Sequence, residues 1–307
     1  MKATLQHPTL VFLTVAFAFA GCNNASQSSV VPGGANAPTG FADARHAPQP
    51  SPSPKLYVAE EATSTIVVFD PTAPSPTPQA VITKGISRPW GIAIDRAANL
   101  YVANEGTRTV TVYRAGQTKP SFQIDSGLGD IPAAVAVDST GNVFVSTVRH
   151  REIVAFHPGH KHAYQSVRLI KGTPFALAFD AGDNLFIADQ KYVYELPRGA
   201  TKAIDLGLSG LDGADGIAFS NGLMYVTNYT LNDVLVYKPG ARSPFLKLSA
   251  GMYGPGSSTF VKPDEFFQVN HIGYNVEGFK RRQLKPFVTI SGLNNPIGVA
   301  STPLQNP

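Results

Sequence analysis

The stretch "GIAIDRAANLYVAN", residues 91–104, decides the fold, because near-copies of it return along the chain. In each copy two short apolar runs flank a polar turn, and the second run ends on a polar side chain. The further copies are "AVAVDSTGNVFVST" (134–147), "ALAFDAGDNLFIAD" (176–189) and "GIAFSNGLMYVTN" (216–228), which follow one another at intervals of 43, 42 and 40 residues. Periods of roughly 40–50 residues are typical of β-propeller blades.

Each copy is followed by two more apolar runs. After the first copy these are "TVTVYRAG" (109–116) and "SFQIDS" (121–126), and a Pro or Gly follows the third run of every copy. Such residues end a strand and begin a turn. Four short strands joined by turns make one blade of a propeller.

The two ends of the repeat region complement each other. The first unit begins with a second strand, "KLYVAE" (55–60), whereas "PIGVAST" (296–302) is a spare first strand, and a weaker unit lies over 259–292. Pairing of the two ends would close the ring and remove exposed sheet edges. We therefore predict an all-β, six-bladed propeller of four-stranded blades over 55–302, followed by a tail over 303–307.

The repeat resembles the NHL-repeat six-bladed propellers of bacteria. The shared pattern is P-x-G-[IV]-A-[IVF]-D, then G-N-L-[YF]-[VI]-A-[ND], then V-x-[VF]-[YF], and the resemblance covers nearly all of 55–302. It implies the fold and says little about function, because propellers of this kind include lactonases, lyases and binding modules.

A more distant resemblance is to the regucalcin-type gluconolactonases, which hold a divalent cation with acidic and Asn ligands at the channel entrance. Asp215, in "ADGIAF", is similar to one ligand motif of that family, but the other matching positions hold Trp, Ala, Phe and Ile. A hard cation needs several oxygen ligands. We therefore expect no cofactor, and the alternative is a metal-dependent lactonase or hydrolase with a cation such as calcium at Asp215.

Polar side chains end the second strand of every unit. Because second strands end on the face where first strands begin, we predict that these side chains form one ring facing the channel mouth. The ring consists of Glu60, Asn104, Thr147, Asp189, Asn228 and Asn270. Such residues either hydrogen-bond the backbone of a local turn or form a polar collar for a ligand, and the sequence leaves both open.

The middle residue of each P-x-G motif begins a first strand on the same face and is predicted to line the channel entrance. These residues are Trp90, Ala133, Phe175, Asp215 and Ile297, with the weak unit represented near Ser258. Aromatic walls with one charge suit a small organic ligand or a peptide side chain, and the alternative is that Trp90 only plugs the channel. By contrast, Asp95, Asp138 and Asp180 end first strands at the opposite face and are predicted to be turn residues.

The N-terminal region is predicted to be separate from the propeller. Residues 1–21 combine Lys2 with the apolar run "TLVFLTVAFAFAG", which is typical of a signal peptide. The run ends at Cys22, the only cysteine, and Ala20-Gly21-Cys22 resembles the lipobox of bacterial lipoproteins, which implies lipidation of Cys22. Residues 22–54 are rich in Pro, Ser, Ala and Gly and are predicted to be a tether. We expect a protein anchored by lipid at the cell envelope, and ordinary secretion is the alternative.

Composition and motifs limit the function further. The net charge is +4, but Lys and Arg do not cluster with aromatic residues, so we expect no nucleic-acid partner. His150, His157, His160 and His162 lie in an outer loop and are read as exposed, with a surface metal site as the alternative. G-x-S-x-G, phosphate-loop and H-E-x-x-H motifs are absent. The sequence favours a monomeric binding or interaction module for a small molecule, protein or peptide.

Overall fold

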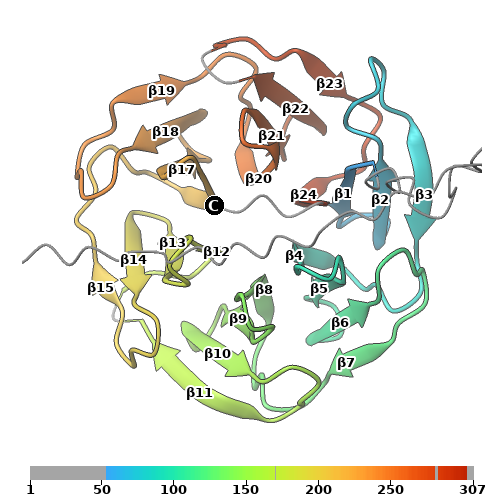
Figure 1. Ribbon diagram of the computed structural model, residues 1–307, viewed down its shortest axis with the longest axis vertical. Helices are drawn as coiled ribbons and strands as arrows, with labels where there is room; N and C mark the ends of the chain where they lie inside the picture. Colours follow the sequence, from blue (N-terminus) through green and yellow to red (C-terminus); the bar gives the residue numbers. More distant parts are fainter. Residues whose placement is uncertain (1–52, 170, 281–282, 303–307) are drawn as a thin grey trace, which may run out of the picture. The chain divides into compact units, whose positions relative to one another are not determined.

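The computed structural model describes residues 53–169, 171–280 and 283–302, and its regular structure there is six four-stranded antiparallel sheets. The sheets are arranged as blades around a central channel (Figure 1). This confirms the all-β, six-bladed propeller. No helix that is long and apolar enough to cross a membrane is found among the described residues. The predicted signal peptide, Cys22 and the tail over 303–307 lie outside them.

From the channel outward, every blade has an innermost, a second, a third and an outermost strand. Blade 1 consists of β24 (Pro296–Thr302), β1 (Lys55–Glu60), β2 (Thr65–Phe69) and β3 (Pro78–Ile82). Blade 2 consists of β4 (Pro89–Ile94), β5 (Leu100–Asn104), β6 (Thr109–Tyr113) and β7 (Phe122–Ile124). Blade 3 consists of β8 (Pro132–Val137), β9 (Val143–Thr147), β10 (Glu152–Phe156) and β11 (Ala163–Arg168).

The remaining blades have the same order. Blade 4 consists of β12 (Ala176–Phe179), β13 (Leu185–Asp189), β14 (Tyr192–Leu196) and β15 (Ile204–Asp205). Blade 5 consists of β16 (Ala214–Ser220), β17 (Leu223–Asn228), β18 (Asp233–Tyr237) and β19 (Leu246–Leu248). Blade 6 consists of β20 (Pro255–Lys262), β21 (Glu265–Asn270), β22 (Asn275–Lys280) and β23 (Val288–Ile290).

The C-terminal strand closes the ring, as the sequence predicted. β24 is the innermost strand of blade 1 and pairs antiparallel with β1, with Tyr57 opposite Ala300 and Lys55 opposite Thr302. Because β24 is the innermost strand of blade 1, its loss would leave β1 without its inner partner.

The core lies between neighbouring blades. Every residue of β5 is buried, because each blade packs on both of its faces against the next. One cluster joins blade 1 to blade 6 and includes Leu56, Val58, Val261 and Val269. This packing explains why the second strands read as unbroken apolar runs.

The recurring glycine of the first strand is required by close approach of the innermost strands. A Cβ atom on Gly91 would lie 2.6 Å from the carbonyl oxygen of Ala133 in the next blade. A Cβ atom on Gly298 would overlap the carbonyl oxygen of Trp90 in the same way. Only glycine fits such contacts without displacing backbone. These residues therefore set the width of the channel.

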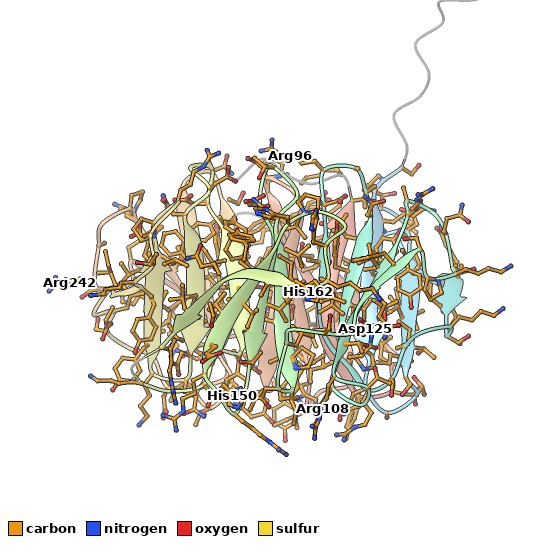
Figure 2. The ribbon with its side chains drawn as sticks, turned by 90° about the horizontal axis from the view of Figure 1, so that it is seen from below. Arg96, Arg108, Asp125, His150, His162 and Arg242 are labelled. Atoms are coloured by element: carbon orange, nitrogen blue, oxygen red, sulfur yellow. The ribbon has the colours of Figure 1, made fainter. Side chains whose placement is uncertain are left out.

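The propeller has two faces with different loops (Figure 2). We call the face with the hairpins between second and third strands the narrow-mouth face, and Arg108 and His150 point outward from it. The opposite face, with Arg96, is the wide-mouth face. Lys55 and Thr302 pair at the wide-mouth ends of β1 and β24. The chain therefore enters and leaves the propeller on the wide-mouth face.

Candidate binding site at the narrow channel mouth

The channel contains two cavities that differ in size. The cavity at the narrow-mouth face has a volume of about 70 Å³, and the cavity at the wide-mouth face has a volume of about 480 Å³. Both touch a belt of residues, one from the innermost strand of each blade. The belt consists of Ile92, Val135, Leu177, Ile217, Ser258 and Val299.

Two aromatic side chains form one wall of the smaller cavity, as predicted from the P-x-G motif. Trp90 and Phe175 stack with their ring centroids 5.9 Å apart and an angle of 28° between the ring planes. They come from blades 2 and 4, and the small, buried Ala133 of blade 3 lies between them in the ring. Stacked rings of this kind leave a flat apolar surface against which a ligand group can pack.

Asp215 is the charged residue of the same cavity. None of the described residues forms a hydrogen bond or an ion pair with its carboxylate, whereas most buried polar groups in proteins have a partner. Its side chain keeps some exposed surface, but that surface faces the channel, so protein surrounds the carboxylate. Burial therefore raises the pKa of Asp215 to about 7.

These three side chains define what the mouth can accept. A cavity of about 70 Å³ holds a single side chain or a group of a few atoms and is far smaller than the usual pocket for an organic ligand. Asp215 would accept hydrogen bonds from that group, and Trp90 and Phe175 would pack against its apolar part. The site therefore suits a protruding hydrogen-bond donor.

The polar ring at the ends of the second strands lies elsewhere than expected. All six side chains are buried, and none lines either cavity, because the innermost strands lie between them and the channel. This corrects the predicted placement of Glu60, Asn104, Thr147, Asp189, Asn228 and Asn270 at the channel mouth. Their predicted role in ligand binding stays a prediction.

Three asparagines of this ring hold the loop that leads into the first strand of their own blade. Asn104 Oδ1 accepts a hydrogen bond from the Ser87 backbone N at 2.9 Å, and its Nδ2 donates to the Gly85 carbonyl at 3.3 Å. Asn228 makes the same pair of bonds to residues 212 and 210, and Asn270 makes it to residues 253 and 251. We call this arrangement the asparagine clamp.

At the other three positions of the ring, other hydrogen bonds replace those of the asparagine clamp. Glu60 Oε1 accepts from the Asn294 backbone N at 2.9 Å, which ties the first blade to the last loop. In blade 3, Thr147 bonds only within its own hairpin, and Asp130 of the loop accepts from the backbone N of His150 at 2.8 Å instead. These bonds hold the loops and hairpins of the narrow-mouth face in place.

Asp189 is the exception, because one oxygen of its carboxylate has no partner, whereas both oxygens of Glu60 accept hydrogen bonds. Asp189 Oδ1 accepts from the Thr173 backbone N at 2.7 Å, but its buried Oδ2 has no hydrogen-bond partner. Burial raises the pKa of Asp189 to about 6. A Cβ atom on Gly172 would overlap Oδ1, so this carboxylate also requires glycine in the loop.

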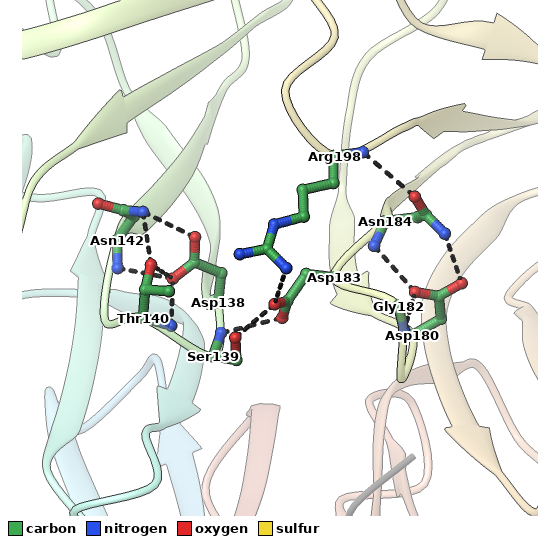
Figure 3. Close-up of polar contacts among 9 residues, drawn as sticks. All are labelled: Asp138, Ser139, Thr140, Asn142, Asp180, Gly182, Asp183, Asn184 and Arg198. Atoms are coloured by element: carbon green, nitrogen blue, oxygen red, sulfur yellow. Dashed lines mark hydrogen bonds and ion pairs between the residues drawn. The ribbon is translucent and has the colours of Figure 1, made fainter.

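The aspartates after the first strands are turn residues, as predicted (Figure 3). Asp138 accepts from the backbone N of Thr140 and of Asn142, at 2.9 Å each, and Asp180 accepts from Gly182 and Asn184 in the same way. Asp95 repeats the pattern in blade 2.

A contact between blades was not expected at this face. Asp183, in the turn of blade 4, accepts hydrogen bonds from the backbone N and the hydroxyl of Ser139 in blade 3, and Arg198 lies 3.5 Å from it (Figure 3). The larger cavity beside these turns was not expected either. The apolar residues that line it have the sequence pattern of strands buried in the core.

The four histidines lie in two loops, His150 between β9 and β10 and the other three between β10 and β11. His157 stacks on Tyr164 with ring centroids 4.1 Å apart, and its Nδ1 lies 3.0 Å from Asn142 Oδ1. Among the described residues, no group of three or more His, Cys, Asp or Glu side chains is placed to hold a metal ion.

Comparisons with known proteins agree with the fold. A chain of the "Crystal structure of Nidogen/Laminin Complex" matches with a TM-score of 0.71 and 14% sequence identity, over 82% of this chain and 99% of that chain. No protein-family model and no curated protein matches the sequence. At this identity the similarity shows the propeller fold alone.

Proposed function

We propose that the protein is a binding module that recognises its partner through the narrow-mouth face, with a donor group of the partner inserted beside Asp215. The unpaired carboxylate of Asp215, enclosed next to the Trp90–Phe175 stack, carries this proposal. A buried carboxylate without a partner is unfavourable, and a bound donor would relieve that cost. The matched structure is titled as a complex of nidogen and laminin, which is compatible with an interaction role for such a fold.

We also propose that Cys22 carries a lipid that anchors the protein at the cell envelope. The basis is the lipobox-like Ala20-Gly21-Cys22 after an apolar run. The chain enters the propeller on the wide-mouth face, where β1 begins at Lys55. The narrow-mouth face lies opposite that point of entry.

A metal-dependent lactonase stays a second prediction, and no observation on the described residues favours it over binding. Asp215 is the only His, Cys, Asp or Glu residue among the described residues that line the smaller cavity. A hard cation would need further oxygen ligands at that site.

Trp90 makes the proposal testable, because it is the only tryptophan of the chain. The purified protein is titrated with lactones, sugars, short peptides and divalent cations while Trp90 emission is recorded. We expect at least one organic class that offers a donor group to shift the emission. Asp215→Asn should weaken that response at least tenfold, whereas Asp264→Asn, an exposed turn residue of the wide-mouth face, should leave it unchanged.

Two results would contradict the proposal. One is silence from every class together with protection of Trp90 from iodide quenching, which would make the aromatic stack a plug of the channel. The other is a response that Asp215→Asn leaves intact. A response to divalent cations alone would favour the metal-dependent alternative.

A further inference from the structure

We propose that the narrow-mouth face docks an acidic protein segment that also carries apolar side chains. The inference rests on the proposed function and names the class of partner: acidic and apolar side chains of the partner contact the loops around the mouth, and a separate donor group enters beside Asp215. It is carried by two features around the mouth, an aromatic patch over blades 5 and 6 and a basic arc over blades 2 to 4. Both lie in the loops of one face.

The aromatic patch consists of exposed apolar side chains in three loops that are bonded to one another. Its members are Leu231, Tyr253, Ile272 and Tyr274, which are between 41% and 57% exposed. The backbone N of residue 254 donates to Asn232 Oδ1 at 2.7 Å, and the backbone N of residue 273 donates to the Tyr253 carbonyl at 3.2 Å. The loops therefore present these side chains together. Contiguous exposed apolar surface of this kind marks interaction sites.

Tyr274 occupies a backbone conformation that suits asparagine better than a bulky side chain. Five of the six hairpins of this face have a residue with positive φ directly before the third strand, with φ between 50° and 56°, and the shorter hairpin of blade 4 is the exception. Blade 5 fills the position with Asn232, which suits this conformation, and blade 6 fills it with Tyr274, at a φ of 50°. Blades 1, 2 and 3 fill it with Ser64, Arg108 and Arg151. A bulky residue in this region is unfavourable, and such strain is concentrated at functional sites. The tyrosine ring is also 55% exposed, so it gains little from packing.

The basic arc supplies the charge of the docking surface. It consists of Arg108, Arg149, Arg151, Lys171 and Lys191, which are all exposed in loops of the narrow-mouth face. Of these five, only Lys191 comes within 4 Å of a carboxylate of the described residues, that of Asp212 at 3.9 Å. Figure 2 shows Arg108 and His150 projecting from this face.

Two acidic residues of the same face contact a cation outside the arc. Glu61 and Glu105, in the hairpins of blades 1 and 2, both pair with Arg88, at 2.7 and 3.2 Å. A surface with exposed cations on one side and exposed aromatic rings on the other complements a chain that alternates acidic and apolar residues. Complementary charge would also speed the encounter with such a partner.

Fluorescence anisotropy tests this with the full-length protein in detergent and the labelled peptide (Glu-Glu-Phe)₄. The comparison peptides are (Lys-Lys-Phe)₄ and (Glu-Glu-Ser)₄, and a 12-nucleotide uridine RNA and heparin test two other anionic classes. We expect (Glu-Glu-Phe)₄ to bind at least fivefold more tightly than every other probe. Its affinity should fall as salt is raised from 50 to 150 mM.

Matched variants separate the docking surface from general charge and hydrophobicity. Tyr274→Asn and Arg149→Glu should each weaken binding at least fivefold. Ile204→Thr and Arg242→Glu make similar changes at exposed positions on the outer edge of the ring and should change it less than twofold. Because Asn suits a positive φ, Tyr274→Asn should melt at the wild-type temperature or above it, so a loss of binding is not a loss of fold.

Three outcomes would overturn this inference: no binding of (Glu-Glu-Phe)₄, equal binding of (Lys-Lys-Phe)₄, or equal effects of the variants and their controls. Tighter binding of RNA or heparin would assign the surface to that class and would also overturn it. The Trp90 response to donor ligands distinguishes the two proposals. If that response persists and depends on Asp215 while the peptide fails, only the class of partner is wrong.

Discussion

Asp189→Asn should stabilise the propeller. In blades 2, 5 and 6 an asparagine at this position donates to a loop carbonyl, and Asp189 replaces that donor with a carboxylate oxygen that has no partner. The Asn side chain keeps the acceptor for the Thr173 backbone N. It also supplies the missing donor, so it should complete the asparagine clamp in blade 4.

The pKa of Asp189 gives the size of the effect. Burial raises that pKa from 3.8 to about 6. A shift of about 2 pKa units corresponds to about 3 kcal/mol of folding free energy lost when the group is ionised in both states. The pKa of Asp189 is higher in the folded protein than in the unfolded chain. The wild-type protein therefore keeps this part of its free energy of unfolding below about pH 4 and loses it as the pH rises through about 6. For a domain of this size about 3 kcal/mol corresponds to about 6–12 °C in Tm.

Thermal unfolding followed by circular dichroism at pH 8.0 and pH 4.5 measures this. We expect Asp189→Asn to raise Tm at pH 8.0, and the gain should shrink to about a third at pH 4.5. Asn104→Asp is the converse variant, because it places a carboxylate against the Gly85 carbonyl, and it should lower Tm at pH 8.0. An equal gain at both pH values, or a lower Tm of Asp189→Asn at pH 8.0, would refute the reasoning.

Three further predictions concern the fold and the anchor. Gly91→Val should destabilise the protein by about 1–3 kcal/mol, because the side chain would collide with the backbone of blade 3. The control Gly116→Asn, at an open turn, should not change the stability. Equal denaturation midpoints of the two variants would contradict the close approach of the strands at Gly91. Deletion of residues 296–307 should cause aggregation, because it removes β24. Deletion of residues 23–53 should leave Tm unchanged. An unchanged Tm after the first deletion would contradict the closure of the ring by β24. Cys22→Ser should move the protein from the membrane fraction to the soluble fraction, and a soluble wild type with an unmodified cysteine would show that the lipid is absent.

The propeller was predictable because its signals repeat. A first strand with glycine, a polar turn and a second strand return at a nearly constant interval, and each blade has the same physical requirements. The closure by β24 was predictable for a related reason, since one unit lacked the strand that the other end supplied. The turn role of Asp138 also followed from the sequence, because its hydrogen bonds are local.

The site was only partly predictable. Trp90, Phe175 and Asp215 were placed at one mouth from their position in the P-x-G motif, and the structure brings them to one cavity. The polar ring was misplaced, because the repeat period predicts on which face of the propeller a residue lies but not how far the residue is from the channel axis. The contact of Asp183 with Ser139 depends on how two blades pack, which repeat spacing does not contain.

The aromatic patch shows a different limit. Tyr253, Ile272 and Tyr274 lie in loops whose sequences differ from blade to blade, so no repeat identifies them. They become a surface only when the loops of blades 5 and 6 are bonded together. Residues that break the repeat are therefore the ones to examine for function in a propeller of this kind.

The pH dependence of Trp90 emission tests most directly whether the narrow mouth presents a free carboxylate to a partner. Wild-type emission should change between pH 5 and 9 with a midpoint near 7, because burial raises the pKa of Asp215 to about 7, and Asp215→Asn should abolish that transition. A ligand that donates to the ionised carboxylate should move the midpoint to lower pH, since binding and deprotonation are linked. Emission that stays constant over this range in the wild type, or a transition that persists in Asp215→Asn, would contradict the account.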